Sequence, residues 1–321
     1  MIHKKERGCP PLGGPHLKNK PCYNSFMPSI PMPSASINKF TAYLKQQDRS
    51  PKTIQGYISD LQSFARWFNQ SNGEKLTEKN LTPTDVREYR QWLVSRDAAP
   101  STINRHLAAL RVFAQWSGFT IDVKGVEEQS LAPHWLDRKE QAALVRETEK
   151  GLNAARTEAA KTQAKRDRAV IILLLNSGLR ISELCALSTK DIELTDRKGK
   201  LIVRQGKGSK KREVPLNRIA REALKDWMNV RSAGDALFEG KRGDRLSPSG
   251  VYRRLVELAR RAKLEDVSPH TLRHTFSKNL VDAGVGLERV AALLGHSNLN
   301  TTRIYTTPGA RDLEKAVEQL E

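Results

Sequence analysis

Five residues in the second half of this chain carry side chains suited to an attack on a phosphodiester. They are Arg180, His270, Arg273, His296 and Tyr305. A guanidinium is planar, bidentate and permanently charged, so it can meet the negative charge that builds on the non-bridging oxygens in the transition state. A histidine can take up or donate a proton, and a tyrosine hydroxyl can attack phosphorus. Together these residue types predict cleavage of a nucleic-acid backbone without a metal ion.

The order and spacing of these residues carry more information than any one of them. Arg180 precedes Glu183 by three residues, so that Glu183 is placed to hold its guanidinium. His270 and Arg273 have the same spacing, which puts them on one helical face within reach of one phosphate. Taken singly, each is more often a surface or structural residue. The complete series is rare by chance, and it is the series that indicates an active site.

On these motifs the chain resembles the tyrosine recombinase (phage integrase) family over most of its length. The family's catalytic set matches this sequence at Arg180, Lys207, His270, Arg273, His296 and Tyr305. Less specific N-terminal motifs match at Ser50-Pro51-Lys52-Thr53, Tyr57, Asp60-Leu61, Thr102, Arg105 and Leu110-Arg111. The resemblance implies a site-specific DNA recombinase that cleaves and rejoins strands and exchanges them between two duplex sites, in integration, excision or resolution.

The resemblance also implies a role for each catalytic residue. Tyr305 attacks the scissile phosphate and forms a 3′-phosphotyrosyl link, which conserves the bond energy, so the step needs no ATP, cofactor or metal. A free tyrosine has a pKa of about 10, and His270 is the candidate base that lets it attack near neutral pH. Arg180 and Arg273 stabilise the developing charge, while His296 hydrogen-bonds a non-bridging oxygen.

A lysine in a glycine-rich turn completes the set. Lys207 lies between Gly206 and Gly208, and the resemblance assigns it the proton that the departing 5′-oxygen needs. Lys210 and Lys211 share this turn and compete for that role, but the Gly-Lys-Gly setting favours Lys207. The remaining histidine of the series, next to Arg273 at position 274, is interpreted as structural, packed or hydrogen-bonded internally.

The chain is strongly basic, which predicts a nucleic-acid partner. Its 321 residues carry a formal net charge of +19 at pH 7, and each lysine or arginine placed on a phosphate releases condensed counterions. Candidate DNA contacts outside the catalytic set are Lys52, Thr53, Arg105 and Lys210. The resemblance adds double-stranded DNA with a specific core site, a homo-tetramer on two duplexes, and room for a partner recombinase.

Cysteine usage and hydropathy predict a cytoplasmic protein. The 3 cysteines imply no disulfide framework. The longest apolar stretch, Ala169 to Leu175, is too short to span a bilayer. The N-terminus lacks the apolar segment of a secretory signal, so neither secretion nor membrane association is expected.

Residues 1–34 are basic and rich in proline, which predicts a flexible tail because they cannot bury enough apolar surface to offset the entropy of ordering them. His3, Cys9, His16 and Cys22 lie here, but their spacing matches no compact zinc finger, and no metal is expected. Whether translation starts at a later methionine stays open.

The rest of the chain divides at one segment. Residues 35–119 show apolar residues at three- and four-residue spacing and predict four to five short helices. Residues 120–133, with glycine, proline and acidic residues, are the expected linker. In residues 134–321, helices are expected at 137–164, 167–175, 181–187, 219–230, 248–263, 269–283, 287–294 and 310–320, with strands at 200–204 and 212–216.

These elements predict a mainly α protein with a small β-sheet. With the resemblance, they give an all-α, SAM-like core-binding domain and an α+β catalytic domain that together form a C-shaped clamp on DNA. Ala310 to Leu320 is amphipathic and is expected to dock into a neighbouring subunit; the alternative is that it closes its own domain.

Two other functions stay open at this point. A non-enzymatic DNA-binding protein of this fold would need neither Tyr305 nor Lys207, so the complete motif set argues against it. A type IB topoisomerase uses similar residues and reseals the same strand, but the recombinase-like N-terminal helices favour strand exchange. The absence of a recognisable arm-binding domain favours a simple Xer-like or transposon-borne recombinase, with the DNA site and directionality unassigned.

Overall fold

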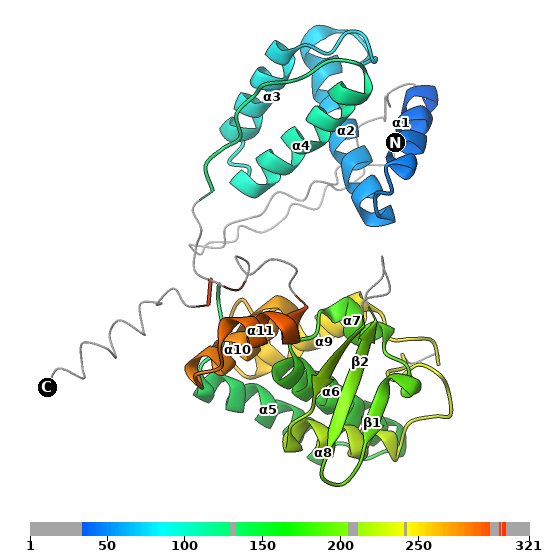
Figure 1. The fold of residues 1–321 in the computed structure, drawn as a ribbon, viewed down its shortest axis with the longest axis vertical. Coiled ribbons are helices and arrows are strands. Elements are labelled where there is room, and N and C mark those ends of the chain that lie inside the picture. Colours follow the sequence, from blue (N-terminus) through cyan, green and yellow to red (C-terminus); the bar gives the residue numbers. More distant parts are fainter. Residues whose placement is uncertain are drawn as a thin grey trace, which may run out of the picture. The chain divides into compact units, whose positions relative to one another are not determined.

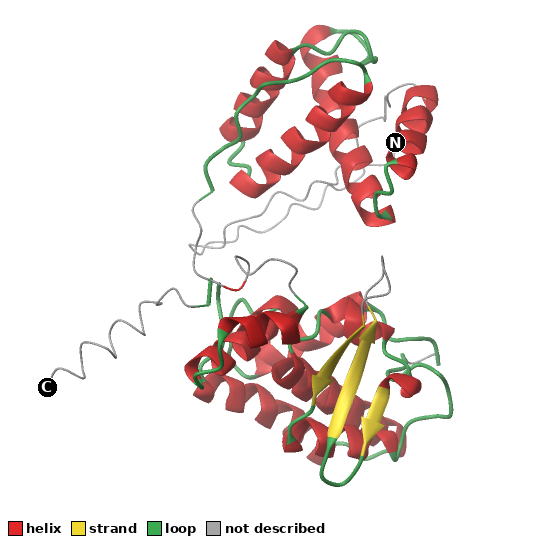
Figure 2. Cartoon of the chain, in the orientation of Figure 1, coloured by secondary structure: helices red, strands yellow, loops and turns green. Residues whose placement is uncertain are grey.

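A computed structural model describes residues 34–128, 133–204, 211–240, 243–295, 302 and 304–305. The chain divides into two compact units, Met1–Gln129 and Ser130–Glu321, and each is described by itself. The division falls within residues 120–133, the segment expected to be a linker. The expected mainly helical fold with a small sheet is confirmed (Figures 1 and 2).

The described part of the N-terminal unit is a bundle of helices. They are α1 (Ser34–Gln46), α2 (Pro51–Asn72), α3 (Pro83–Ser95) and α4 (Pro100–Trp116). The last three open on a proline at the first turn, where the missing N–H is not needed. Its core is aromatic: Phe64 meets Tyr89 edge-on at 5.0 Å, and Phe40 meets Phe113 at 5.3 Å between ring centroids.

In the second unit, a three-stranded sheet and several helices surround one helix, α6 (Glu158–Ser177), whose second half is buried. Its helices are α5 (Arg138–Asn153), α6 (Glu158–Ser177), α7 (Ile181–Ala186), α8 (Arg218–Met228), α9 (Pro248–Arg261), α10 (Pro269–Asp282) and α11 (Leu287–Leu294), with a 3₁₀ turn at Thr189–Asp191. The strands β1 (Ile192–Leu194), β2 (Gly199–Arg204) and β3 (Lys211–Pro215) form an antiparallel sheet in that order. α6 packs against α5, α8 and α10, and its second half is buried almost without interruption.

Two expectations about this unit were wrong. The predicted helix at 137–164 breaks at residues 154–157, because the Thr157 side chain accepts a hydrogen bond from the Ala160 N–H and starts α6 there. α6 then runs on through 164–167, where a boundary was expected. The sheet also contains a strand that was not expected, β1, which is only three residues long and too short to show an alternating pattern.

Several predictions lie outside the described residues. These are the tail up to residue 33, Lys207, Lys210, His296 and the amphipathic segment 310–320. The clamp likewise stays a prediction. Within the described chain, no helix combines the length and apolar character needed to cross a membrane. Cys185 is buried among core residues, and burial raises the pKa of its thiol to about 11.

Candidate active site

The turn between α6 and α7 places Arg180 and requires a glycine. Gly178 has φ of +61°, and a Cβ there would lie 2.4 Å from Phe276 Cδ1 on α10. Only glycine therefore lets this turn adopt the left-handed conformation and pack against α10. Two residues later Arg180 leaves the turn and caps the N-terminus of α7 with extended backbone. The predicted helix start at this arginine is confirmed.

Glu183 binds Arg180 and also a second arginine. Its Oε1 accepts from Arg180 Nη1 at 2.8 Å, and its Oε2 accepts from the Arg180 backbone N–H at 2.9 Å. Arg212, on β3, donates Nη1 and Nη2 to the same two oxygens at 3.0 and 2.7 Å. Burial opposes the charge of Glu183, but the hydrogen bonds and charge of Arg212 and the hydrogen bonds from Arg180 outweigh it and hold the pKa of Glu183 below the usual range.

Arg273 lies at the centre of the site and is almost fully buried, with 5% exposed. It donates Nη1 to the carbonyl of Gly178 and Nη2 to the carbonyl of Leu294 at 2.8 Å. Burial, together with the nearby charge of Arg180, lowers the pKa of Arg273 to about 10. Two guanidinium groups held this close create a concentrated positive field that favours a doubly charged phosphorane-like group.

Tyr305 is the most buried of the catalytic candidates that the structure describes, with 2% exposed. It packs with Phe276, Val290 and Leu294, and its hydroxyl shares a hydrogen bond of 2.9 Å with His274 Nδ1. Burial raises the pKa of Tyr305, against a lowering influence from Ser277 and Arg273. The phenol is therefore protonated and sheltered in this structure.

His274 is a neutral partner for that hydroxyl. Burial lowers its pKa to about 4, and the charges of His270 and Arg273 act in the same direction. A ring with so low a pKa is a weak base near pH 7. His270, by contrast, is exposed at the first turn of α10. The structure thus places His274 on the tyrosine hydroxyl and leaves His270 open to solvent.

Comparisons with known proteins identify the family. The phage integrase family model matches residues 135–311, and the model of the phage integrase N-terminal SAM-like domain matches residues 37–117. Tyrosine recombinase XerA of Thermococcus kodakarensis is 31% identical over 307 residues, which cover 90% of this chain and 96% of that protein. The chain belongs to the phage integrase, or tyrosine recombinase, family.

Other relatives support the same assignment over shorter stretches or in fold alone. Tyrosine recombinase XerC of Corynebacterium efficiens is 38% identical over 173 residues, 53% of this chain and 54% of that protein. A crystal structure of XerH bound to a palindromic difH substrate, a post-cleavage complex, shares the fold with a TM-score of 0.70 at 22% identity, over 91% of this chain and 90% of that one. This chain is a tyrosine-type site-specific recombinase, which cleaves and rejoins DNA at specific sites.

The candidate DNA contacts of the recombinase's N-terminal unit lie on α2 and α4. Lys52 is exposed, while the Thr53 hydroxyl hydrogen-bonds the Ser50 cap at 2.8 Å. Arg105 has 51% of its side chain exposed and donates to the buried Asp60 at 2.5 Å. Asp60 therefore holds one side of the Arg105 guanidinium in place, and the other side stays accessible to a phosphate.

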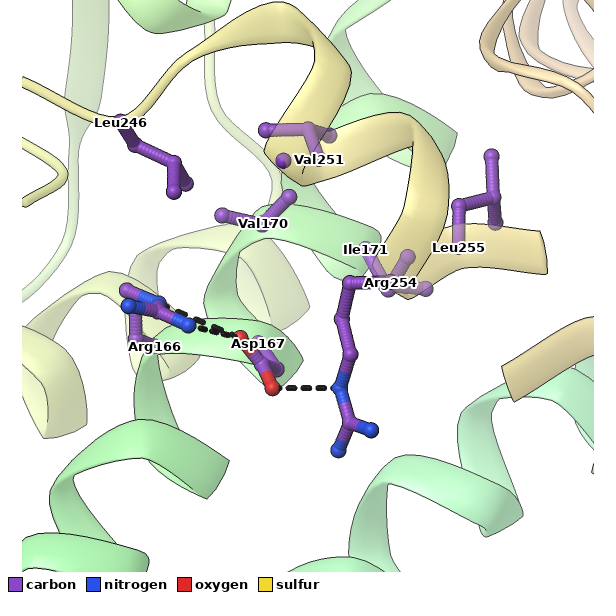
Figure 3. Close-up of a pocket in the computed structure, with 9 residues that line it drawn as sticks. Arg166, Asp167, Val170, Ile171, Leu246, Val251, Arg254 and Leu255 are labelled. Carbon is purple, nitrogen blue, oxygen red and sulfur yellow. Dashed lines mark hydrogen bonds and ion pairs between the residues drawn. The ribbon is translucent and has the colours of Figure 1, made fainter. Parts of the chain in front are cut away.

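The described residues of the recombinase contain no group of three or more His, Cys, Asp or Glu that could hold a metal ion. A small hollow lies between α6 and α9, where Arg166 and Arg254 approach Asp167 from two sides (Figure 3). Arg166 Nη2 donates to Asp167 at 2.9 Å and Arg254 Nε at 2.6 Å. None of the predicted site residues lines this hollow.

One residue of the site, Arg212, was missed from the sequence, while the internal hydrogen bond expected for His274 is confirmed, with Tyr305 as its partner. Arg212 was assigned to a strand without a function, although it shares the inward face of that strand with the buried Val214. An arginine at an inward position is a signal, because a buried guanidinium needs an acidic or carbonyl partner. The contact of His274 with Tyr305 had no local signal, since 31 residues separate them.

Proposed function

We propose that the recombinase cleaves DNA by in-line attack of the Tyr305 hydroxyl on the scissile phosphate. The P–O5′ bond breaks as the Tyr305–phosphorus bond forms, giving a 3′-phosphotyrosyl link and a 5′-hydroxyl. The observation that supports this proposal is the position of Tyr305 against Leu294, whose carbonyl accepts from Arg273 at 2.8 Å. Burial raises the phenol's pKa, and the charge of Arg273 opposes that rise. A 5′-hydroxyl from a second duplex then reverses the step and completes strand exchange.

Proton transfers complete the reaction. His270 takes the phenolic proton, because it is open to solvent, whereas burial lowers the pKa of His274. Lys207 donates a proton to the departing 5′-oxygen, and His296 hydrogen-bonds a non-bridging oxygen. Arg180 and Arg273 stabilise the pentacovalent state with two fixed positive charges.

Attack requires Tyr305 to leave its present environment. A hydroxyl with so little exposure cannot reach a phosphate in a duplex. Its hydrogen bond to the neutral His274 is worth about 1 kcal/mol, which binding to DNA can readily offset. We infer that DNA binding accompanies release of Tyr305 from His274.

The assembly follows the family. We propose a homo-tetramer, with room for a partner recombinase, on two duplexes that each carry a specific core site. Lys52, Thr53 and Arg105 hold the backbone, and 310–320 docks into a neighbour. Phosphate contacts supply most of the affinity, so binding falls steeply with salt. The relatives named XerA and XerC favour a simple Xer-like task in the cytoplasm over phage integration.

A nicked suicide duplex tests the nucleophile. Duplexes from the gene's own neighbourhood are incubated with the wild type, Tyr305→Phe and Tyr252→Phe, an exposed tyrosine of α9, and run on a denaturing gel. We expect a covalent adduct from the wild type and Tyr252→Phe and none from Tyr305→Phe, with duplex binding unchanged in all three. An adduct from Tyr305→Phe would disprove the assignment. Relaxation of supercoiled plasmid without recombinant products would favour topoisomerase activity instead.

A further inference from the structure

Arg212 uses all three of its guanidinium nitrogens on two distant parts of the catalytic unit. Nη1 and Nη2 form a fork on the carboxylate of Glu183, and Nε donates to the carbonyl of Leu293 at 3.0 Å. Only 10% of its side chain is exposed. A surface arginine would lose side-chain entropy for little gain in such an arrangement, so this degree of fixation points to a specific role.

The fork on Glu183 changes what Arg180 can do. A carboxylate paired with Arg180 alone would neutralise it and compete with a phosphate for its donors. With Arg212 filling one face of the carboxylate, Arg180 keeps a single side-chain bond to Glu183, and 39% of its side chain stays exposed. Arg180, Arg212 and Glu183 together carry a net charge of +1, so the excess positive charge remains available to the substrate.

The third bond reaches the end of α11. Leu293 and Leu294 form the last turn of this helix, where carbonyls have no partner within the helix. Arg212 binds the first carbonyl and Arg273 the second, at 3.0 and 2.8 Å. The chain continues from here through Gly295 towards Tyr305, so both arginines fix the point at which this segment leaves the helix.

Arg212 also lies near the start of β3, which follows the segment 205–210 that contains Lys207 in the sequence. It is paired with Val203 across the β2–β3 ladder, one position inside the terminal pair, Arg204 and Lys211. We propose that Arg212 is a positioning residue that joins Arg180, the end of α11 and the start of β3 into one rigid unit. This proposal rests on the proposed function only for the role of Arg180 in cleavage.

Two lysine variants separate this role from general support of the fold. Arg212→Lys keeps the charge but cannot form the fork and the third bond together. Arg166→Lys is the matched control, because Arg166 also binds a carboxylate, Asp167, and one carbonyl, that of Glu239, with 12% of its side chain exposed (Figure 3). Thermal unfolding of both variants reports the shared loss of stability.

Hydrogen exchange of the full chain without DNA tests the mechanical link. We expect Arg212→Lys to speed exchange at the start of α7, where the Arg180 and Leu184 amides are hydrogen-bonded, and in the last turn of α11 together, while Arg166→Lys leaves both at the wild-type rate. Wild-type exchange in those two segments of Arg212→Lys would overturn the proposal. So would faster exchange spread evenly over the unit, because that pattern belongs to loss of overall stability.

Single-turnover cleavage tests the chemical consequence. With the suicide duplex, we expect Arg212→Lys to form adduct about 10²-fold more slowly at unchanged binding, because a displacement of about 1 Å in a catalytic group has that effect. A methylphosphonate at the scissile position removes one negative oxygen, so the defect should shrink on it if Arg212 acts through Arg180. A defect of equal size on both substrates would overturn that step. If the wild type forms no adduct, the proposed function fails, and hydrogen exchange still decides the role of Arg212.

Discussion

Both units of the recombinase use a buried carboxylate to hold a partly exposed arginine, but they stabilise the carboxylate differently. In the N-terminal unit Asp60 binds Arg105, and its other neighbour is the neutral ring of His106, at 3.4 Å. In the catalytic unit Glu183 binds Arg180 and also Arg212. Burial raises the pKa of Asp60, whereas the two arginines keep the pKa of Glu183 low.

The second arginine accounts for the difference. One half-exposed guanidinium does not compensate for the burial of Asp60, whose Oδ2 has no hydrogen-bond partner within the described chain. Two guanidinium groups, one of them buried, keep Glu183 charged and rigid. We infer that the N-terminal pair tolerates loss of its charge, as a DNA-binding surface can, while the catalytic pair is built for fixed geometry.

The largest expected effect is on catalysis. Arg180→Ala removes one of two fixed charges from the transition state, so adduct formation should slow by about 10²–10³-fold. Arg105→Ala removes a charge of equal size from the other pair and should leave the rate of the bound complex unchanged. Single-turnover cleavage at saturating protein measures both. A comparable slowing by Arg105→Ala would contradict the distinction drawn between the two arginine–carboxylate pairs.

The second-largest expected effect is on stability, because removing the carboxylate charge should destabilise the two units by different amounts. Glu183→Gln leaves Arg212, with only 10% of its side chain exposed, without its counter-charge, and we expect a loss of about 3 kcal/mol of stability in the catalytic unit. Asp60→Asn should change the N-terminal unit by at most about 1 kcal/mol, because Arg105 can turn to solvent. Denaturant-dependent hydrogen exchange reads the two units separately, and equal losses would contradict the interpretation.

Acid should destabilise the catalytic unit more than the N-terminal one. The pKa of His274 is lowered to about 4, so between pH 6.5 and 4 this histidine is protonated in the unfolded chain and neutral in the folded chain. Its stabilising contribution is complete above pH 6.5 and declines as the pH falls, by on the order of 1–2 kcal/mol for a partly exposed ring. The lowered pKa of Glu183 adds a further loss below about pH 4.5.

In the N-terminal unit two groups oppose each other. The lowered pKa of His106 acts like that of His274, but the raised pKa of Asp60 works the other way, since its stabilising contribution returns as the pH falls. Hydrogen exchange of each unit from pH 7 to 4 measures the difference, and His274→Gln should flatten the curve of the catalytic unit alone. A steeper decline in the N-terminal unit would refute this.

The smallest effect concerns affinity. Arg105→Gln should weaken duplex binding evenly across sequences and reduce the slope of log affinity against log salt by about one, as expected for one phosphate contact. Fluorescence anisotropy at several salt concentrations gives the slope. An unchanged slope would remove Arg105 from the DNA surface, and Asp60 would then be its structural partner only.

Local sequence signals explain why most elements were predictable. Ser50, Ser247 and Ser268 precede prolines that open α2, α9 and α10, so cap and first-turn residues mark these starts directly. The start of α6 was missed because Thr157 lies in a charged stretch that favours helix on both sides. β1 was missed because its three residues gain their stability from pairing with β2.

The sequence by itself determined the family, the mainly helical fold and the identity of the residues proposed for catalysis, because these depend on residue types at fixed local spacing. Only the tertiary structure decided how they are held. Arg212 meets Glu183 across 29 residues and Leu293 across 81, and His274 meets Tyr305 across 31. Such contacts form when distant segments pack around a common core, and no periodicity within either segment specifies them.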